Sequence, residues 1–179
     1  MRSNIVSIVL MLFTLVSTSL HAQITSLNQY RLGAGDLLQI TVYGQDDLSL
    51  KTRLTDIGVV NYPYLGEVKV IGMTISELEN YIYKGLKGDY LVEPSVSVSI
   101  LDYRPFFING EVKKPGGYPY QPGLSIDKAA ALAGGYTERA SKTKVQIVRE
   151  MDGKRVTIPV DNNASVLPGD IVTVEQSFF

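Results

Sequence analysis

The stretch from Phe106 to Ser141, FFINGEVKKPGGYPYQPGLSIDKAAALAGGYTERAS, constrains the fold more than any other part of the chain. It places a short apolar strand before a charged turn, adds an aromatic second strand, and continues into a helix of small residues. Pro115 fixes one backbone angle, and Gly116 and Gly117 permit positive φ, so we expect a tight reversal there. Strand, turn, strand and helix in this order predict the opening of a β-grasp domain.

The helix in this stretch has its own start and stop signals. Ser125 can cap a helix whose interior, Asp127 to Ala133, is mostly alanine and leucine. Gly134 and Gly135 suit a left-handed exit from it. Further strands are expected at about 144–149, 155–160 and 171–175, with a turn at residues 152 and 153. The segment therefore specifies a scaffold rather than a catalytic pocket.

The first half of the chain mixes strands with one helix. Alternating apolar residues predict strands at about 38–42, 54–62, 66–70 and 95–100. Thr74-Ile75-Ser76-Glu77 is a capping box, and helical spacing extends the helix to about Leu86, with Gly85 and Gly88 helping to stop it. We predict an α+β fold: a small mixed sheet with one helix in residues 23–103, then the β-grasp domain in residues 104–179.

The strand at 95–100 carries two different faces. Val96, Val98 and Ile100 share one of them, and three serines share the other. Such a continuous small polar face is either solvated or lies close to another subunit.

Two glycine-aspartate turns resemble each other. Leu32-Gly33-Ala34-Gly35-Asp36 and Leu167-Pro168-Gly169-Asp170 each stand immediately before an alternating apolar strand. The aspartate side chain can bond backbone amides of its own turn, so we expect a structural role for Asp36 and Asp170 rather than a metal or catalytic one.

The first residues have the order of a secretory signal. Met1-Arg2 is followed by an apolar run, Ile5 to Val16, and then by small residues ending at Ala22. The run is too short to span a bilayer, so we expect a cleaved signal peptide in residues 1–22 and a periplasmic protein. With no cysteine in the chain, there is no attachment point for a lipid, and we do not expect a lipoprotein.

Composition excludes several kinds of chemistry. The single histidine, His21, lies in the predicted signal peptide, so the mature chain has no imidazole base, no thiol nucleophile and no ordinary zinc site. A net charge of −1 argues against nucleic acid as the main partner. We expect no catalytic residues, no metal and no cofactor.

At this point the chain resembles a known family, the Wza-like bacterial outer-membrane polysaccharide export proteins. The segment 106–141 is similar to their soluble-ligand-binding β-grasp (SLBB) module. The preceding polysaccharide export domain is matched by four features: Tyr30 to Leu38, the turn Asp56-Ile57-Gly58, the segment Tyr62 to Val68, and Gly72-Met73-Thr74. The glycine and proline motifs are individually loose, but their order and spacing agree along nearly all of the mature chain.

The resemblance implies a part of a translocon. Such proteins form periplasmic rings, often octameric, that guide capsule or exopolysaccharide chains together with an inner-membrane copolymerase. This chain lacks a lipidated cysteine, has one recognisable β-grasp module, and shows no pore-forming helix after it. We therefore expect a short member, peripheral to the outer membrane, that works with a separate outer-membrane β-barrel protein.

Saccharide or subunit contact is predicted for a few residues around the β-grasp domain. Tyr118 and Tyr120, two apart on one strand, would share a face and offer a stacking platform, with Tyr103 and Tyr136 nearby. Arg104, Lys113 and Lys114 can attract an acidic polymer. The alternative is that the tyrosines pack over the core and the charges are simply solvated.

The sequence leaves other functions open. A glycosidase can work with two carboxylates, but Asp46 and Asp47 are neighbours that would point to opposite faces of a strand. A small outer-membrane β-barrel would suit the terminal Phe178-Phe179, although two capped helices count against it. A monomeric periplasmic module that binds a glycan or small ligand is the third alternative.

Overall fold

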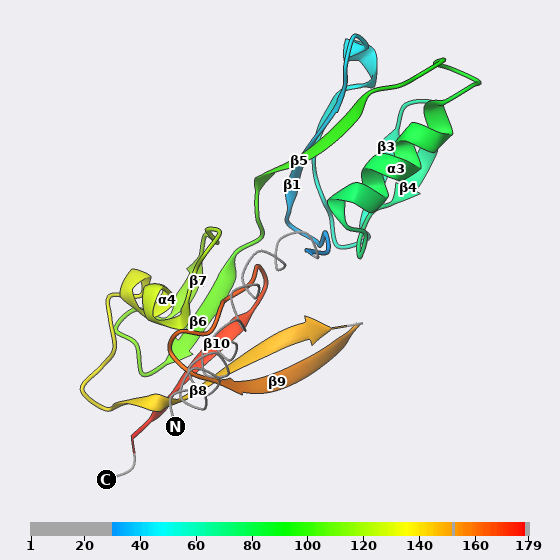
Figure 1. Cartoon of the computed structure of the whole chain (residues 1–179). Helices are drawn as coiled ribbons and strands as arrows, with labels where there is room; N and C mark the ends of the chain where they lie inside the picture. Colours follow the sequence, from blue (N-terminus) through cyan, green and yellow to red (C-terminus); the bar gives the residue numbers. More distant parts are fainter. Residues whose placement is uncertain (1–29, 152, 178–179) are drawn as a thin grey trace, which may run out of the picture. The chain divides into compact units, whose positions relative to one another are not determined.

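The computed structural model describes residues 30–151 and 153–177, and these form an α+β protein (Figure 1). The predicted signal peptide, His21, Asp152 and the terminal phenylalanines lie outside the described residues. Within the described part of the chain, no helix combines the length and apolar character needed to cross a bilayer.

A three-stranded antiparallel sheet forms the first part of the N-terminal domain. Its order is β2-β1-β5, with β1 (Leu37–Val42) between β2 (Leu50–Arg53) and β5 (Val96–Asp102). A short 3-10 helix, η2 (Asp46–Leu48), lies in the β1–β2 connection. Leu38, Ile40 and Val42 are buried, as the alternation predicts.

A hairpin and a helix complete this domain. β3 (Val59–Tyr62) pairs with β4 (Gly66–Lys69). The predicted strand at 54–62 begins only at Val59, because residues 55–58 turn instead: the Gly58 amide donates to the Thr55 carbonyl and Gly58 has φ +69°. Leu54 is instead tied to the first aspartate turn, since its amide donates to the Asp36 carbonyl.

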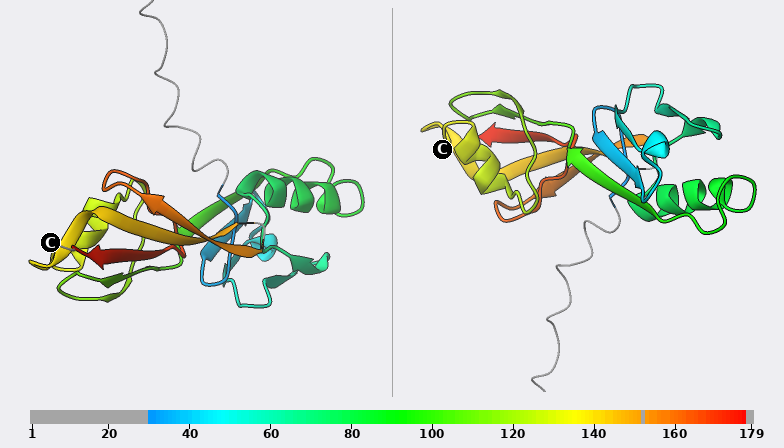
Figure 2. Two further views of the ribbon diagram at one scale, coloured as in Figure 1. Left: turned by 90° about the horizontal axis from the view of Figure 1, so that it is seen from below. Right: turned by 90° about the horizontal axis from the view of Figure 1, so that it is seen from above.

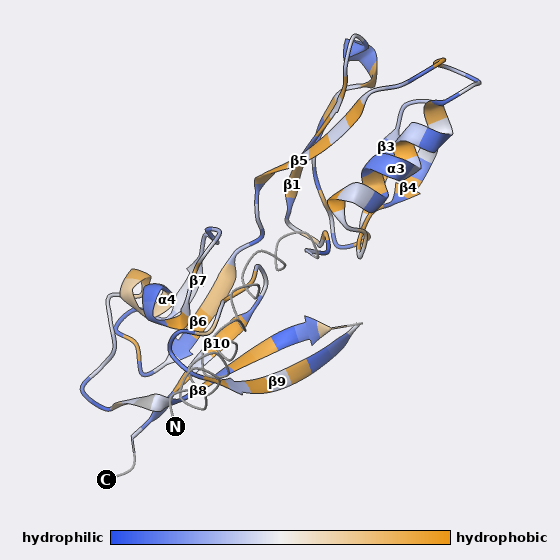
Figure 3. Cartoon of the chain, viewed as in Figure 1, coloured by the Kyte–Doolittle hydropathy of each residue, from blue (hydrophilic) through white to orange (hydrophobic). Residues whose placement is uncertain are grey.

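The helix α3 (Ile75–Leu86) is bounded by the predicted start signal. Both halves of the capping box are present, and the bond from the Thr74 amide holds the pKa of Glu77 below its ordinary value. Leu78, Ile82 and Leu86 are buried along one stripe of a helix whose other side is polar (Figure 3). Gly88, with φ +92°, follows the end.

Gly85 does not stop α3 as the sequence suggested, because it lies inside the helix. A Cβ there would lie 2.7 Å from Cδ2 of Leu65 in the β3–β4 turn. The glycine therefore allows the hairpin to approach the helix closely.

The β-grasp domain has a five-stranded mixed sheet of order β7-β6-β10-β8-β9. Its strands are β6 (Phe106–Gly110), β7 (Gly116–Tyr118), β8 (Ala140–Met151), β9 (Lys154–Val160) and β10 (Ile171–Gln176). β10 runs parallel to β6 and antiparallel to β8. The helix α4 (Ile126–Leu132) packs on one face of this sheet, and Ile126, Ala129 and Ala130 join its core (Figure 2).

The turn between β6 and β7 differs from the sequence prediction. Gly116 and Gly117 belong to strand β7, and neither has positive φ. The left-handed residue is Gly110 at the end of β6, with φ +81°. Pro115 precedes β7, and the amides of Lys113 and Lys114 donate to the carbonyls of Gly135 and Ala133 after α4. The reversal is thus tied to the helix exit, where Gly134 and Gly135 both have positive φ.

Replacing Tyr62 with phenylalanine is expected to weaken the N-terminal domain. The buried Tyr62 hydroxyl donates to the Leu48 carbonyl at 2.6 Å, so the variant leaves that carbonyl unsatisfied and loses about 1 to 2 kcal/mol. Chemical denaturation at pH 7, followed by circular dichroism, measures this loss. Tyr43→Phe, at an exposed tyrosine, is the matched control.

Tyr62 also predicts a pH dependence. Burial raises its pKa to about 12 from an ordinary value near 10. The folded state thus favours the protonated phenol, and the resulting stability is complete below pH 10 and lost as the pH rises towards 12. Tyr62→Phe should therefore show a shallower loss of stability between pH 10 and 12. An identical slope in both proteins would contradict this assignment.

Candidate functional site

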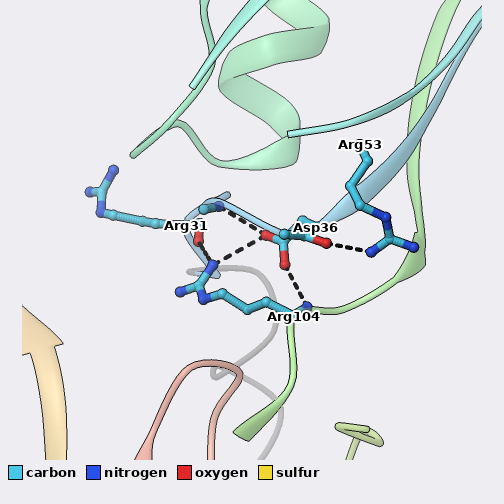
Figure 4. Close-up of polar contacts among 6 residues, drawn as sticks. Arg31, Asp36, Arg53 and Arg104 are labelled. Carbon is cyan, nitrogen blue, oxygen red and sulfur yellow. Dashed lines mark hydrogen bonds and ion pairs between the residues drawn. The ribbon is translucent and has the colours of Figure 1, made fainter. Parts of the chain in front are cut away.

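The first aspartate turn forms a buried polar centre next to the end of β5 (Figure 4). Asp36 has no exposed surface. Its Oδ2 accepts from the Gly33 amide at 2.8 Å, and its Oδ1 accepts from the Arg104 amide at 2.9 Å. Nη1 of Arg104 lies 3.2 Å from Oδ2. The carboxylate is thus held by two backbone amides and one guanidinium, an arrangement that fixes the chain path.

Arg104 lies against both glycine-aspartate turns. A Cβ on Gly33 would lie 2.1 Å from Nη1 of Arg104, and a Cβ on Gly169 would lie 2.7 Å from its Nε. The Gly169 amide also donates to the Pro105 carbonyl. The guanidinium is paired with Asp36, so Arg104 has a structural role at this turn, and attraction of an acidic polymer stays a prediction.

The second aspartate turn repeats the design of the first. Oδ2 of the buried Asp170 accepts from the Leu167 amide at 2.7 Å, three residues earlier, as Asp36 does from Gly33. Arg149 on β8 binds both carboxylate oxygens, with Nε 2.9 Å from Oδ1 and Nη2 2.7 Å from Oδ2. Each turn therefore combines a buried aspartate, its own backbone and one arginine from a distant segment.

Two arginines at these turns were missed by sequence reasoning. Arg149 is one, and Arg53 is the other: its Nη1 donates to the Gly35 carbonyl at 2.6 Å and its Nη2 to Asp102 at 3.0 Å. The sequence of each turn predicts that its aspartate can accept hydrogen bonds beyond the one from its own backbone. Nothing in the local sequence indicates which arginine supplies the donors.

The structure buries one member of the predicted tyrosine platform and leaves the other partly exposed. Tyr120 is only 7% exposed and belongs to the β-grasp core, where its ring meets Tyr103 edge-on at 5.2 Å. Burial raises the pKa of both phenols. Tyr118 stacks on Phe106 and donates its hydroxyl to the Lys114 carbonyl. The rings of Tyr103, Tyr118 and Tyr120 therefore pack in or against the β-grasp core, which was the alternative stated for the tyrosines.

The remaining predicted contact residues lie around the exit of α4. Lys113 and Lys114 are exposed. The Tyr136 hydroxyl donates to Asp127 at 2.8 Å, and burial, with this bond, raises the pKa of Tyr136. Tyr136 packs against the same core cluster that contains Tyr120, whereas the Arg104 guanidinium is paired with Asp36.

A polar cleft of about 540 Å³ lies beside α3. One wall comes from α3 and the other from the segment that leads into β5. Hydroxyl, amide and carboxylate groups dominate its lining, which consists of Ser76, Glu79, Asn80, Tyr83, Pro94, Ser95 and Val96. Glu79 accepts from the Val98 amide at 2.8 Å, so this carboxylate covers the outer edge of β5. The cleft suits a hydrophilic ligand.

The structure places the four aspartates that the sequence offers for hydrolysis or for the turns. Asp46 and Asp47 lie exposed in η2 rather than on a strand, and Asp36 and Asp170 are occupied in their turns. Across residues 30–151 and 153–177, no group of three His, Cys, Asp or Glu side chains comes together that could hold a metal ion.

Comparison with protein families accounts for this architecture. Residues 25–101 match the polysaccharide biosynthesis/export protein model, and residues 105–159 match the SLBB domain model. The two matches follow each other in the order predicted from the sequence. The chain belongs to the polysaccharide export protein family. In this family member, the export match covers the N-terminal sheet, the β3–β4 hairpin and α3, and the SLBB match covers α4 and the β-grasp strands that precede β10.

Curated relatives are named for the production, export or transport of polysaccharides. Exopolysaccharide production protein ExoF of Rhizobium meliloti is 28% identical, over 82% of this chain and 44% of the relative. EPS I polysaccharide export outer membrane protein EpsA of Ralstonia nicotianae is 27% identical, over 82% and 47%. Polysialic acid transport protein KpsD of Escherichia coli is 28% identical, over 79% and 25%. The chain thus spans less than half the length of each of these three relatives.

Proposed function

We propose that this chain is a non-enzymatic periplasmic component of a polysaccharide export apparatus, and that its copies assemble into a ring that conducts the polymer toward the outer membrane. The observation that carries the proposal is the match to an export domain followed directly by an SLBB domain. The names of the relatives, which include exopolysaccharide production and polysialic acid transport, support a polysaccharide as the substrate.

The polar chemistry of the structure is consistent with a conduit. The two buried aspartates of the glycine-aspartate turns hold the chain path, and the cleft beside α3 presents hydroxyl and amide groups. Such groups form exchangeable hydrogen bonds with a hydrated glycan. An inner-membrane copolymerase and an outer-membrane β-barrel protein remain predicted partners.

Deletion of the gene tests the export role. We expect the deletion strain to lose cell-surface polysaccharide and to recover it when the full-length chain is supplied from a plasmid. Quantification of surface and periplasmic polysaccharide provides the measurement. A deletion strain that still coats itself normally would contradict the proposal.

Assembly is tested separately on the purified protein. Light scattering after size-exclusion chromatography, with and without the copolymerase, should give several times the monomer mass. A monomer under both conditions would favour the alternative of a simple binding module.

A further inference from the structure

Tyr64 occupies an unusual backbone conformation. It lies in the turn between β3 and β4 with φ +62°, and it is the only residue other than glycine with positive φ in residues 30–151 and 153–177. The left-handed region is costly for a residue with a bulky side chain. Gly66, two residues later, also has positive φ. Glycine would adopt the same conformation at position 64 without strain. A tyrosine at such a strained position points to a use for its side chain.

The ring of Tyr64 stacks on that of Tyr90. The ring centroids are 4.6 Å apart and the planes meet at 23°. Tyr90 follows α3 in a tight turn, where its amide donates to the Leu86 carbonyl and the Gly88 amide donates to the Leu91 carbonyl. The approach of Leu65 to Gly85 sets the hairpin close against α3. The two rings therefore come from two separate turns, each held by contacts with α3.

The pair is exposed, although stacking usually accompanies burial. Tyr64 is 66% exposed and Tyr90 is 47% exposed. Within the part of the chain that the structure describes, neither hydroxyl makes a hydrogen bond to a protein group. The pair thus combines a flat apolar surface with two hydroxyls open to a ligand.

We propose that Tyr64 and Tyr90 form a stacking platform for sugar rings of the polymer, an inference that rests on the proposed export function. The C–H faces of a pyranose match flat aromatic surface, and sugar hydroxyls can bond the phenol oxygens. Stacking without charge pairing gives weak, repeatable contacts, which suit a chain that must keep moving. The platform lies in the export domain, whereas Tyr118 and Tyr120 belong to the β-grasp domain, where Tyr120 is buried in the core.

Substitutions that change one property at a time test the platform. The probe is the surface polysaccharide purified from the producing strain and shortened by mild acid hydrolysis, with binding followed by calorimetry and saturation-transfer NMR. The double variant Tyr64→Ala/Tyr90→Ala should bind roughly tenfold or more weakly, because it removes two stacking rings. Tyr64→Phe/Tyr90→Phe should stay within about threefold of wild type, because both rings remain. Tyr43→Ala, at a tyrosine 65% exposed, is the control and should bind as wild type.

Tyr64→Gly separates binding from folding. Glycine adopts the left-handed conformation without strain, so the melting temperature should equal or exceed that of wild type while binding falls. A clear fall in melting temperature would show that the ring stack serves stability, and it would overturn the proposal.

Two other results would also overturn the platform. One is unchanged polymer binding by the double alanine variant, or no binding by wild type. The other is a smaller assembly for that variant with binding intact, which would make the pair a subunit contact. A deletion strain that loses export, rescued fully by the double alanine variant, would refute the platform but leave the export function standing.

Discussion

Replacing Gly110 with alanine is expected to destabilise the β-grasp domain by roughly 3 kcal/mol or more. Gly110 ends β6 with φ +81°, and a Cβ there would lie 2.1 Å from the carbonyl oxygen of Val174 on β10. Backbone strain and a backbone clash therefore act together. The sheet can relieve the clash only by separating β6 from β10, which also strains the bond from the Glu111 amide to Val174.

Gly117→Ala provides the matched control for Gly110→Ala. Gly117 lacks positive φ, and its added Cβ would lie 2.9 Å from Cε1 of Phe107, a half-exposed side chain that can move aside. We expect a loss below about 1 kcal/mol. Urea unfolding followed by circular dichroism compares the two variants. Equal losses in both would show that the contact between Gly110 and β10 is not the source of the effect.

Asp170→Ala is expected to lose about 3 kcal/mol of stability. The substitution leaves Arg149 without its bidentate partner and the Leu167 amide without an acceptor, in a place where little water can replace them. The loss should be visible as a lower denaturation midpoint of the β-grasp domain. Asp36→Ala should behave similarly in the export domain, since the amides of Gly33 and Arg104 lose their acceptor.

Asp102→Ala is the control for the aspartate variants. Asp102 also bonds an arginine, Arg53, but both side chains are about half exposed. Water replaces the lost partner, so the expected change is below about 1 kcal/mol. If Asp102→Ala were as damaging as Asp170→Ala, burial would not be the reason that the aspartate turns matter.

Local signals in the sequence predicted much of this fold. The capping box of α3 and the alternation in β1 depend on residues a few positions apart, and both appear as expected. The equivalence of the two glycine-aspartate turns was also visible, because each aspartate bonds an amide three residues earlier. In these cases the determining contact lies within the segment itself.

The features that sequence reasoning missed depend on contacts between distant residues. The bond between Arg149 and Asp170 joins β8 to a turn 21 residues away, and a charge in a strand does not reveal its partner. The proline-glycine-glycine segment led to a predicted reversal with positive φ at Gly116 and Gly117. The left-handed conformation is instead at Gly110, where the backbone passes close to the Val174 carbonyl. Asn109-Gly110 is a common turn dipeptide and was the available signal.

The placement of the tyrosines required the tertiary structure. Spacing predicted that Tyr118 and Tyr120 lie on one strand, but β7 ends at Tyr118, and packing places Tyr120 in the core. Conversely, Tyr64 and Tyr90 are separated in sequence by α3, and no local pattern predicts that their rings meet.

The central position of β10 affects how the chain acquires its structure. β10 lies between β6 and β8 in the sheet. Phe107 therefore pairs with Ile171 only after the chain between them, including α4 and the β8–β9 hairpin, has been synthesised. Such long-range pairing slows folding, because a large loop must close before the bonds between β6 and β10 form. During synthesis, the edges of β6 and β8 that pair with β10 therefore stay unpaired until residue 176 has emerged. Such unpaired edges are prone to aggregation, so binding of a chaperone during that interval would protect the unfinished sheet.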